Sequence, residues 1–520
     1  MMRTAWPIAL LLVASCARCA GPRGASSAEE LLPRGTSGAI LSAPLGVLAR
    51  HAAALADRVG QLAGGEDVAK ARASLPAQFG FDPFTREGQL AAGLDPDRGA
   101  AATLQTAAAG RGSWVAALPL TKPNLFLEAF DRLARERAGY PTRTDEARGE
   151  LRIAVYARER DKLAVAVVRG YGVVARGEDP AGDLAAASQR KPGESLASDT
   201  PLQALRGKLG AQDLIVFAPK GSPLSRRLSP QPLPGDVALG LGGSAEGLGS
   251  RLIASLPEAE ARRAQAALPG GGADLVELLP AGAPFRMRLG VSPQALYAEL
   301  QGSAAAGLFE KLPAAAAVFA TLLPGAVVSV SLRPQANLAA AIDSGFDPRR
   351  KSPFDTLQLV ALARVKDAAA ARKAIAGLVG EMPRIGARAI RHGDDVTVTL
   401  PTAGEGVRFG IRDLEGKPVA YFLGGGLAPE DLRRTPKPAS LDPAALYADQ
   451  GAAFFVDFGK LAEAVRALPE GAYGTGPQAY VARSVVSQIV EPLRTVKIEG
   501  GAVATPDGVT GDLVVGLKKP

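Results

Sequence analysis

Residues 151–176 read LRIAVYARERDKLAVAVVRGYGVVAR and contain three short strand-like runs. Apolar residues alternate or follow one another at 151–156, 162–168 and 173–176, and Gly170-Tyr171-Gly172 supplies a tight turn before the last run. Short apolar runs separated by turn residues are typical of hairpin-connected antiparallel strands. We therefore predict an antiparallel meander over this stretch.

A strand and a helix are predicted before this meander. Trp114 to Leu120 forms a strand-like apolar run, and Pro123 opens a segment whose apolar residues fall at helical spacing. The order strand, helix and hairpin strands indicates an α+β fold, with mainly antiparallel sheets flanked by helices.

The same order of elements recurs later in the chain. A strand at 357–365 leads into a helix at 367–379, for which Asp367 suits the N-cap, and three alternating runs follow at 396–400, 407–411 and 419–423. Each set is then followed by a short polar helix, an aspartate that starts a helix, and a buried-looking strand: 183–188, Asp199 and 214–217 in the first copy, and 429–434, Asp442 and 454–458 in the second.

Two short identities suggest how the copies align. Leu-Leu-Pro occurs at 31–33 and 322–324, and Gly-Phe-Asp-Pro occurs at 80–83 and 345–348. A partial third relative is the helix start at 292–299, which is similar to 442–449. We predict two related α+β modules, residues 30–320 with an extra C-terminal subrepeat from about residue 235, and residues 321–520.

The N-terminus has the order of an export signal, which we assign to residues 1–15. Arg3 precedes the apolar run Ile8 to Val13, which is too short to span a bilayer, and Ala14-Ser15 supplies small residues. A conventional signal cut after Ala17 or Ala20 is the alternative, and Arg18 at the −3 position disfavours the second of these cuts.

Val-Ala-Ser-Cys at 13–16 resembles the lipobox of bacterial lipoproteins. This resemblance implies that Cys16 carries acyl chains such as palmitate and becomes the new N-terminus, and that residues 16–29 form a flexible tether. Each buried methylene of such chains contributes about 0.8 kcal/mol to anchoring. Because Ala17 follows instead of aspartate, the resemblance also implies the periplasmic face of the outer membrane, with surface exposure as an alternative.

The signal, the two copies and the Ala-, Arg-, Gly- and Pro-rich composition together resemble large uncharacterised lipoproteins of high-GC Gram-negative bacteria, which are related to a bacterial domain of unknown function. The resemblance implies an envelope location. It carries no known activity and supplies no catalytic residues.

Composition narrows the possible partners. The chain has 520 residues, a net charge of +8 and two cysteines, Cys16 and Cys19, so no disulfide stabilises the predicted modules. Only 5% of residues are aromatic, and basic pairs and triplets are scattered at 226–227, 349–351 and 433–434. Nucleic-acid binders usually gather basic and aromatic residues in one patch, so we predict no nucleic-acid partner. A weak preference for anionic envelope polymers stays open.

Residues for ordinary catalysis are scarce. His51 and His392 are the only histidines, and no cysteine lies in the modules, so we predict no metal site and no cofactor. A Gly-x-Ser-x-Gly motif is absent, and the Ser-x-x-Lys match at Ser188 and Lys191 is followed by Pro192, which indicates an exposed loop.

Glycine-rich and acidic segments have structural interpretations. The segment 240–245 approximates Gly-x-Gly-x-x-Ala, but we interpret it as a tight turn between a strand and a helix near 246–256, and 424–426 as a turn of the same kind. The acidic clusters at Asp394-Asp395 and Asp95-Pro96-Asp97 suit turns and helix caps better than calcium.

These observations predict a non-enzymatic, outer-membrane-anchored lipoprotein that acts as a binding or scaffolding module. Its partners would be the membrane, through Cys16, and an envelope protein, polymer or lipid. Two alternatives stay open. An envelope hydrolase with dispersed carboxylates requires a concave site where acidic groups converge. A carrier of an apolar ligand requires a sheet-lined cavity free of charged side chains.

Overall fold

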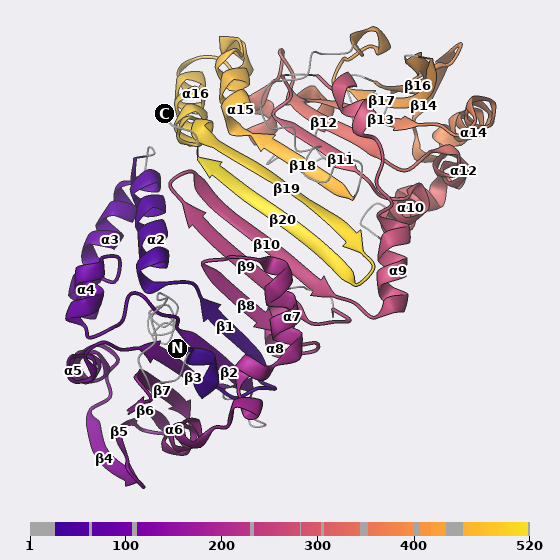
Figure 1. Cartoon of the computed structure of the whole chain (residues 1–520). Coiled ribbons are helices and arrows are strands. Elements are labelled where there is room, and N and C mark those ends of the chain that lie inside the picture. Colours follow the sequence, from indigo (N-terminus) through magenta and orange to yellow (C-terminus); the bar gives the residue numbers. More distant parts are fainter. Residues whose placement is uncertain are drawn as a thin grey trace. The chain divides into compact units, whose positions relative to one another are not determined.

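The computed structural model describes residues 27–61, 65–106, 112–228, 233–280, 282–302, 306–343, 352–399, 406–414, 416–432 and 451–517. The chain divides into two compact units after Pro257. Figure 1 labels the helices and strands of both. The predicted signal, Cys16 and most of the tether lie outside the described residues. None of the helices in the described ranges is long and apolar enough to cross a membrane.

Unit 1 is built on one antiparallel sheet with the strand order β4-β5-β6-β7-β3-β2-β1-β8-β9-β10. Its strands are β1 (Gly38–Ser42), β2 (Ala101–Thr106), β3 (Gly112–Pro119), β4 (Thr142–Arg148), β5 (Leu151–Arg158), β6 (Asp161–Val168), β7 (Tyr171–Gly177), β8 (Leu214–Ala218), β9 (Val237–Ser244) and β10 (Gly247–Ser255). Its helices are η1 (Ala28–Leu31), α2 (Leu45–Gly60), α3 (Glu66–Phe79), α4 (Arg86–Ala91), α5 (Pro123–Arg132), η2 (Leu133–Arg137), α6 (Pro180–Gln189), η3 (Pro192–Glu194), η4 (Leu196–Ser198), α7 (Thr200–Leu209) and α8 (Pro223–Leu228).

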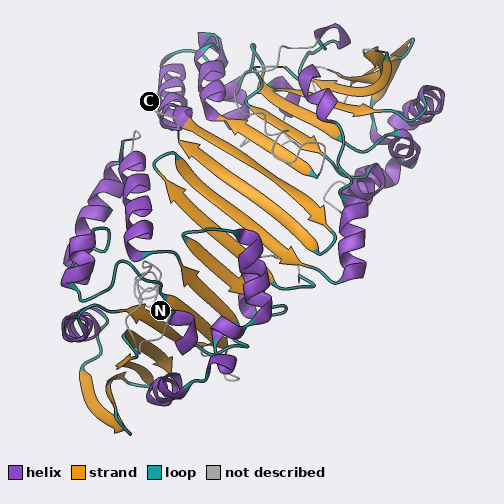
Figure 2. Ribbon diagram, viewed as in Figure 1, coloured by secondary structure: helices purple, strands orange, loops and turns teal. Residues whose placement is uncertain are grey.

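Helices cover both faces of the unit 1 sheet (Figure 2). Successive residues of a strand point to opposite faces, so Ala164 and Ala166 of β6 join a core with η1, α6 and α7. Leu163 and Val165 of the same strand join a second core with α2 and α5. Burial on both faces explains why β6 and β7 are continuously apolar instead of alternating.

Unit 2 has the strand order β14-β15-β16-β17-β13-β12-β11-β18-β19-β20, again antiparallel throughout. Its strands are β11 (Phe285–Leu289), β12 (Ala326–Leu332), β13 (Leu357–Arg364), β14 (Arg388–His392), β15 (Asp395–Thr399), β16 (Val407–Leu414), β17 (Lys417–Gly424), β18 (Ala452–Asp457), β19 (Val496–Thr505) and β20 (Gly508–Leu517). Its helices are α9 (Glu258–Ala267), η5 (Ala273–Leu278), α10 (Pro293–Gly302), α11 (Ala306–Lys311), α12 (Ala314–Thr321), α13 (Leu338–Asp343), η6 (Pro353–Asp355), α14 (Ala368–Glu381), η7 (Met382–Ile385), η8 (Pro429–Asp431), α15 (Phe458–Arg466), η10 (Glu470–Tyr473), α16 (Pro477–Val490) and η11 (Glu491–Thr495).

The α+β class is confirmed, and the ten strands described in each unit follow one common order. The three runs within 151–176 form β5, β6 and β7. In the second copy the runs at 407–411 and 419–423 lie within β16 and β17, and residues 396–399 of the first run lie within β15, whereas residue 400 is outside the described residues. Asp367 is the N-cap of α14, where its carboxylate accepts hydrogen bonds from the N–H groups of Ala369 and Ala370.

The division between the units differs from the expected one between residues 320 and 321. Leu-Leu-Pro at 322–324 leads into β12, the second strand of its unit, whereas 31–33 precedes β1, the first strand. Because β11 and β12 pair directly, for example at Met287 and Val328, they belong to one unit. The expected subrepeat from residue 235 is therefore split, with β9 and β10 in unit 1.

The segment 240–245 does not lead into a helix: residues up to Ser244 belong to β9, and β10 returns as its hairpin partner. The predicted repeat segments 345–348 and 442–449 lie outside the described residues.

Candidate functional site

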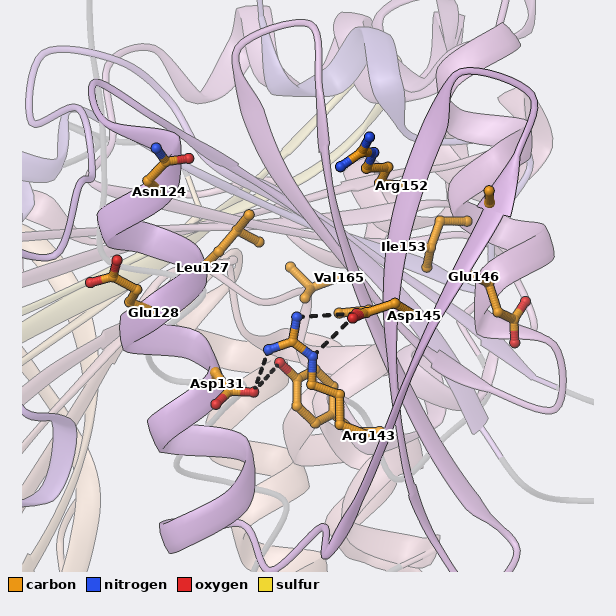
Figure 3. A pocket seen from close by; sticks show the side chains of 13 residues that line it. Asn124, Leu127, Glu128, Asp131, Arg143, Asp145, Glu146, Arg152, Ile153 and Val165 are labelled. Carbon is orange, nitrogen blue, oxygen red and sulfur yellow. Dashed lines mark hydrogen bonds and ion pairs between the residues drawn. The ribbon is translucent and has the colours of Figure 1, made fainter.

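A groove of about 670 Å³ lies in unit 1 between helix α5 and the β4–β5 hairpin (Figure 3). It is lined by Asn124, Leu127, Glu128, Asp131, Arg143, Asp145, Glu146, Ala147, Arg152, Ile153, Ala154, Tyr156 and Val165. The groove therefore combines an apolar floor with charged rims.

Helix α5 forms one wall of the groove, because its apolar face packs on the sheet and its other face is free to line the groove. Pro123 occupies its first turn, and Phe126 and Phe130 are buried against the sheet. Asn124, Leu127, Glu128 and Asp131 follow at the i, i+3, i+4, i+7 spacing that aligns side chains on one face, and this face borders the groove.

Close packing fixes the height of α5 above the sheet. A Cβ added at Gly172 of β7 would collide with the ring of Phe126, so only glycine leaves room for it there. The rings of Phe130 and Tyr156 meet edge to face at 5.8 Å between centroids.

The hairpin forms the opposite wall and the floor. Arg143 pairs with Tyr156 across the β4–β5 ladder, Asp145 with Ala154, and Ala154 in turn with Val165 of β6. Directly paired residues share a sheet face, so these side chains all face the groove. Every residue of β4 is exposed, and its charged residues are of the kind that protect an edge strand against pairing.

One hydrogen-bond network joins the two walls. The Asp131 Oδ1 atom accepts hydrogen bonds from Arg143 Nη1 and from Tyr156 Oη, both at 2.9 Å. Arg143 also donates through Nε and Nη2 to Asp145 Oδ1, at 3.2 and 3.1 Å. Asp131 on the helix and Asp145 on the strand thus hold one guanidinium between them, as Figure 3 shows.

Burial and this network determine the titration of its members. Burial, followed by the hydrogen bond to Asp131, raises the pKa of Tyr156 well above its usual range, so its hydroxyl stays protonated. Burial lowers the pKa of Arg143, but hydrogen bonds to Asp145 and Asp131 outweigh it and leave that pKa raised.

The groove carries an excess of negative charge. Glu128, Asp131 and Asp145 contribute three carboxylates, against the two guanidinium groups of Arg143 and Arg152. Glu146 also lines the groove, but it pairs with Ile153 and therefore points to the other face of the hairpin, where its carboxylate lies 3.7 Å from Arg148. Arg143 is held by the two aspartates. Figure 3 shows Glu128 on α5 and Arg152 on β5 at the open part of the groove, outside the drawn network. These two side chains are therefore available to a ligand.

The residues singled out from the sequence lie elsewhere. His51 is on α2, with Nδ1 2.9 Å from Asp213 Oδ1, and Asp213 Oδ2 accepts a hydrogen bond from the Gly243 N–H at 2.7 Å. This arrangement connects α2 to β9. His392 ends β14 in the other unit, opposite Asp395. Among the described residues, no group of three His, Cys, Asp or Glu side chains is placed to hold a metal ion.

The remaining sequence matches have structural roles. The Ser188 hydroxyl donates to the carbonyl of Ala185 within α6, while Lys191 lies beyond that helix as the N-cap of η3. Asp97 pairs with Arg86, and Asp394 pairs with Arg372. The glycines 425 and 426 both have positive φ in the turn between β17 and η8, as expected for a tight turn.

None of the groove residues was singled out from the sequence. The signal that could have found them is the polar stripe on the α5 segment, together with the charged run at 142–148. No family model, curated protein or solved structure matches this chain.

Proposed function

We propose that this chain is a lipid-anchored, non-enzymatic binding protein of the bacterial cell envelope, and that the groove between α5 and the β4–β5 hairpin is its ligand site. The groove carries the proposal, because it combines a volume of about 670 Å³ with apolar and charged lining groups. Sites with an apolar body and a few polar groups that fix orientation are typical of ligand pockets.

The lining indicates the ligand's chemistry. Leu127, Ala154 and Val165 offer apolar contact, while carboxylates outnumber guanidinium groups. An extended ligand with an apolar segment and a cationic group, such as a basic peptide segment, matches this distribution. A purely apolar ligand does not, because charged side chains border the groove, and the carrier alternative therefore loses support.

Anchoring is the second part of the proposal. It rests on the lipobox-like residues 13–16. Processing of the precursor should be blocked by globomycin, an inhibitor of lipoprotein signal peptidase, and should be lost in Cys16→Ala. Unchanged processing of that variant to a soluble product would overturn anchoring.

We also attribute the common strand order of the two units to duplication of one α+β module. Glu-Leu-Leu-Pro at 30–33 and 277–280 supports this view. It precedes the first strand at the same spacing in both units, with Pro33 before Gly38 and Pro280 before Phe285. The leucines of both copies are buried.

Site-specific photocrosslinking tests the groove. Benzoylphenylalanine replaces Leu127 in the groove or, as the control, Glu66 on the exposed surface of α3. Irradiated native envelopes should give an adduct from position 127 alone, and this adduct should weaken in Glu128→Gln. Equal adducts from both positions, or none from position 127, would contradict a binding groove.

A hydrolase is the second candidate, because the groove does bring three carboxylates together, those of Glu128, Asp131 and Asp145. However, Asp131 and Asp145 both accept hydrogen bonds from Arg143, whereas a general acid has to donate a proton. The hydrolase hypothesis predicts turnover of an envelope polymer that is lost in Glu128→Gln.

A further inference from the structure

Helix α16 of unit 2 is apolar on two sides (labelled in Figure 1). On its inner side, Ala479, Ala482 and Val486 pack against a buried cluster that includes Leu468 and Tyr473. This packing fixes the orientation of the helix on its unit.

The outer side of α16 carries four exposed apolar residues. Tyr480 is 70% exposed, Val481 64%, Val485 47% and Ile489 61%. Val481, Val485 and Ile489 are spaced by four residues, so they form one row along the helix, with Tyr480 beside its start. Single exposed apolar residues are common on proteins, but a contiguous row marks an interaction surface.

The charges around this row favour an anionic partner. Helix α16 contains no acidic residue, and Arg483 is its only charged residue. Arg466 of α15 and Arg494 of η11 are about half exposed and both bond to Glu491, and Arg483 pairs with Glu470 of η10. Because α15, η10 and η11 pack against α16, these ion pairs place three guanidinium groups and two carboxylates on and around the helix, a small excess of positive charge. The chain as a whole has a net charge of +8.

A lipid surface fits this combination better than a protein does. Acyl chains accept the aliphatic row, the phenol of Tyr480 suits the headgroup boundary, and guanidinium groups pair with lipid phosphates. One aromatic and three aliphatic side chains fall well short of the roughly 800 Å² that each partner buries in a standard protein interface. A weak contact suffices at a membrane that already holds the protein, because anchoring raises its effective concentration there.

We propose that the outer face of α16 lies on an anionic bilayer and forms a second membrane contact beside the acylated Cys16. The proposal rests on the anchoring proposed above, and it does not involve the groove of unit 1.

Tryptophan depth measurements test the contact on the mature full-length chain. Ile489→Trp reports on the row, and Glu66→Trp, at an exposed position on α3, is the matched control. Each protein is reconstituted into phosphatidylglycerol-containing vesicles with ordinary or brominated acyl chains. Trp114 of β3 is present in both variants, so its fluorescence, measured in the protein without an added tryptophan, is subtracted. Both changes are at exposed positions, so unchanged circular dichroism is expected.

Bromine should quench the tryptophan at position 489 and leave the one at position 66 unaffected. Vesicles of phosphatidylcholine alone should reduce the quenching at 489. Serine at positions 481 and 485 should also reduce it, because the row then loses its apolar contact. Absence of quenching at 489 in anchored protein would overturn the proposal and leave the anchor intact.

A blue shift at 489 that depends on protein concentration, without bromine quenching, would assign the row to a protein interface and also overturn the proposal. Quenching at 489 in protein whose N-terminus proves unmodified would support the contact while refuting the anchor. The two proposals therefore fail independently.

Discussion

Removal of the Asp131 carboxylate should destabilise unit 1 more than any other single change in the groove. Asp131 accepts one hydrogen bond from Tyr156, whose side chain is almost completely buried, and one from Arg143, whose side chain is 41% exposed. In Asp131→Ala the tyrosine hydroxyl stays in the core without its acceptor, while Arg143 keeps Asp145.

The expected magnitude follows from these two bonds. A buried hydroxyl without its charged partner costs about 1–3 kcal/mol, and a half-exposed ion pair adds about 0–1 kcal/mol. Asp131→Ala should therefore lower the free energy of unfolding by about 1–4 kcal/mol. Asp145→Ala removes the other, more exposed acceptor of Arg143 and should cost under about 1 kcal/mol.

A double-mutant cycle with Tyr156→Phe isolates the buried bond. Phenylalanine leaves no hydroxyl to satisfy, so the double variant should cost about 1–2 kcal/mol less than the sum of the single ones. Urea unfolding followed by Trp114 fluorescence suits the measurement, because Trp114 packs against the same core as Tyr156. If Asp131→Ala costs no more than Asp145→Ala, or if the single costs simply add, the assigned role of Asp131 is wrong.

Three further changes test the framework of unit 1. Burial and a hydrogen bond to an aspartate raise the pKa of Tyr140 to about 12, whereas an unfolded tyrosine ionises near about pH 10. Its contribution to stability is thus fully present below about pH 10 and lost as the pH rises to about 12. In Tyr140→Phe the free energy of unfolding, measured by urea titration at each pH, should therefore fall less steeply over that window. Asp213→Ala removes the acceptor that ties α2 to the sheet, so it should cost about 1–3 kcal/mol and speed hydrogen exchange in α2; unchanged exchange would argue against the tie. Gly172→Ala forces a Cβ against the aromatic ring that α5 places there and should lower the free energy of unfolding by about 1–3 kcal/mol, whereas Gly193→Ala, with open space around it, should be neutral; equal effects would contradict the packing.

Local sequence patterns predicted much of the fold. The strands within 151–176 could be predicted because their apolar runs and turns follow one another directly, and the cap at Asp367 because its spacing to the next helix is local. The hairpin of β9 and β10 was misread. Its second strand reads GLGSRLIAS, and a short apolar run after glycines does not distinguish a strand from a helix by periodicity alone.

The boundary between the units was predicted in the wrong place because of a misleading three-residue sequence identity. Leu-Leu-Pro at 322–324 matches 31–33 in letters, but Glu-Leu-Leu-Pro at 277–280 is the copy in the equivalent place before the first strand. Only the pairing of β11 with β12 reveals the difference, because sequence identity over three residues carries no information about strand partners.

The groove could not be predicted because its parts meet only through tertiary structure. Asp131 lies in a helix and Asp145 in a strand beyond it, and Arg143 joins them only once the hairpin curls toward α5. The α5 segment was recognised for its apolar face, and the polar face opposite was the overlooked signal.

Mass spectrometry of the processed N-terminus, from protein extracted from membranes, tests the proposed lipid anchor. We expect a chain that begins at Cys16 and carries a diacylglyceryl group and an amide-linked acyl chain. A mature chain that begins at a later residue, or a Cys16 without added lipid, would contradict it.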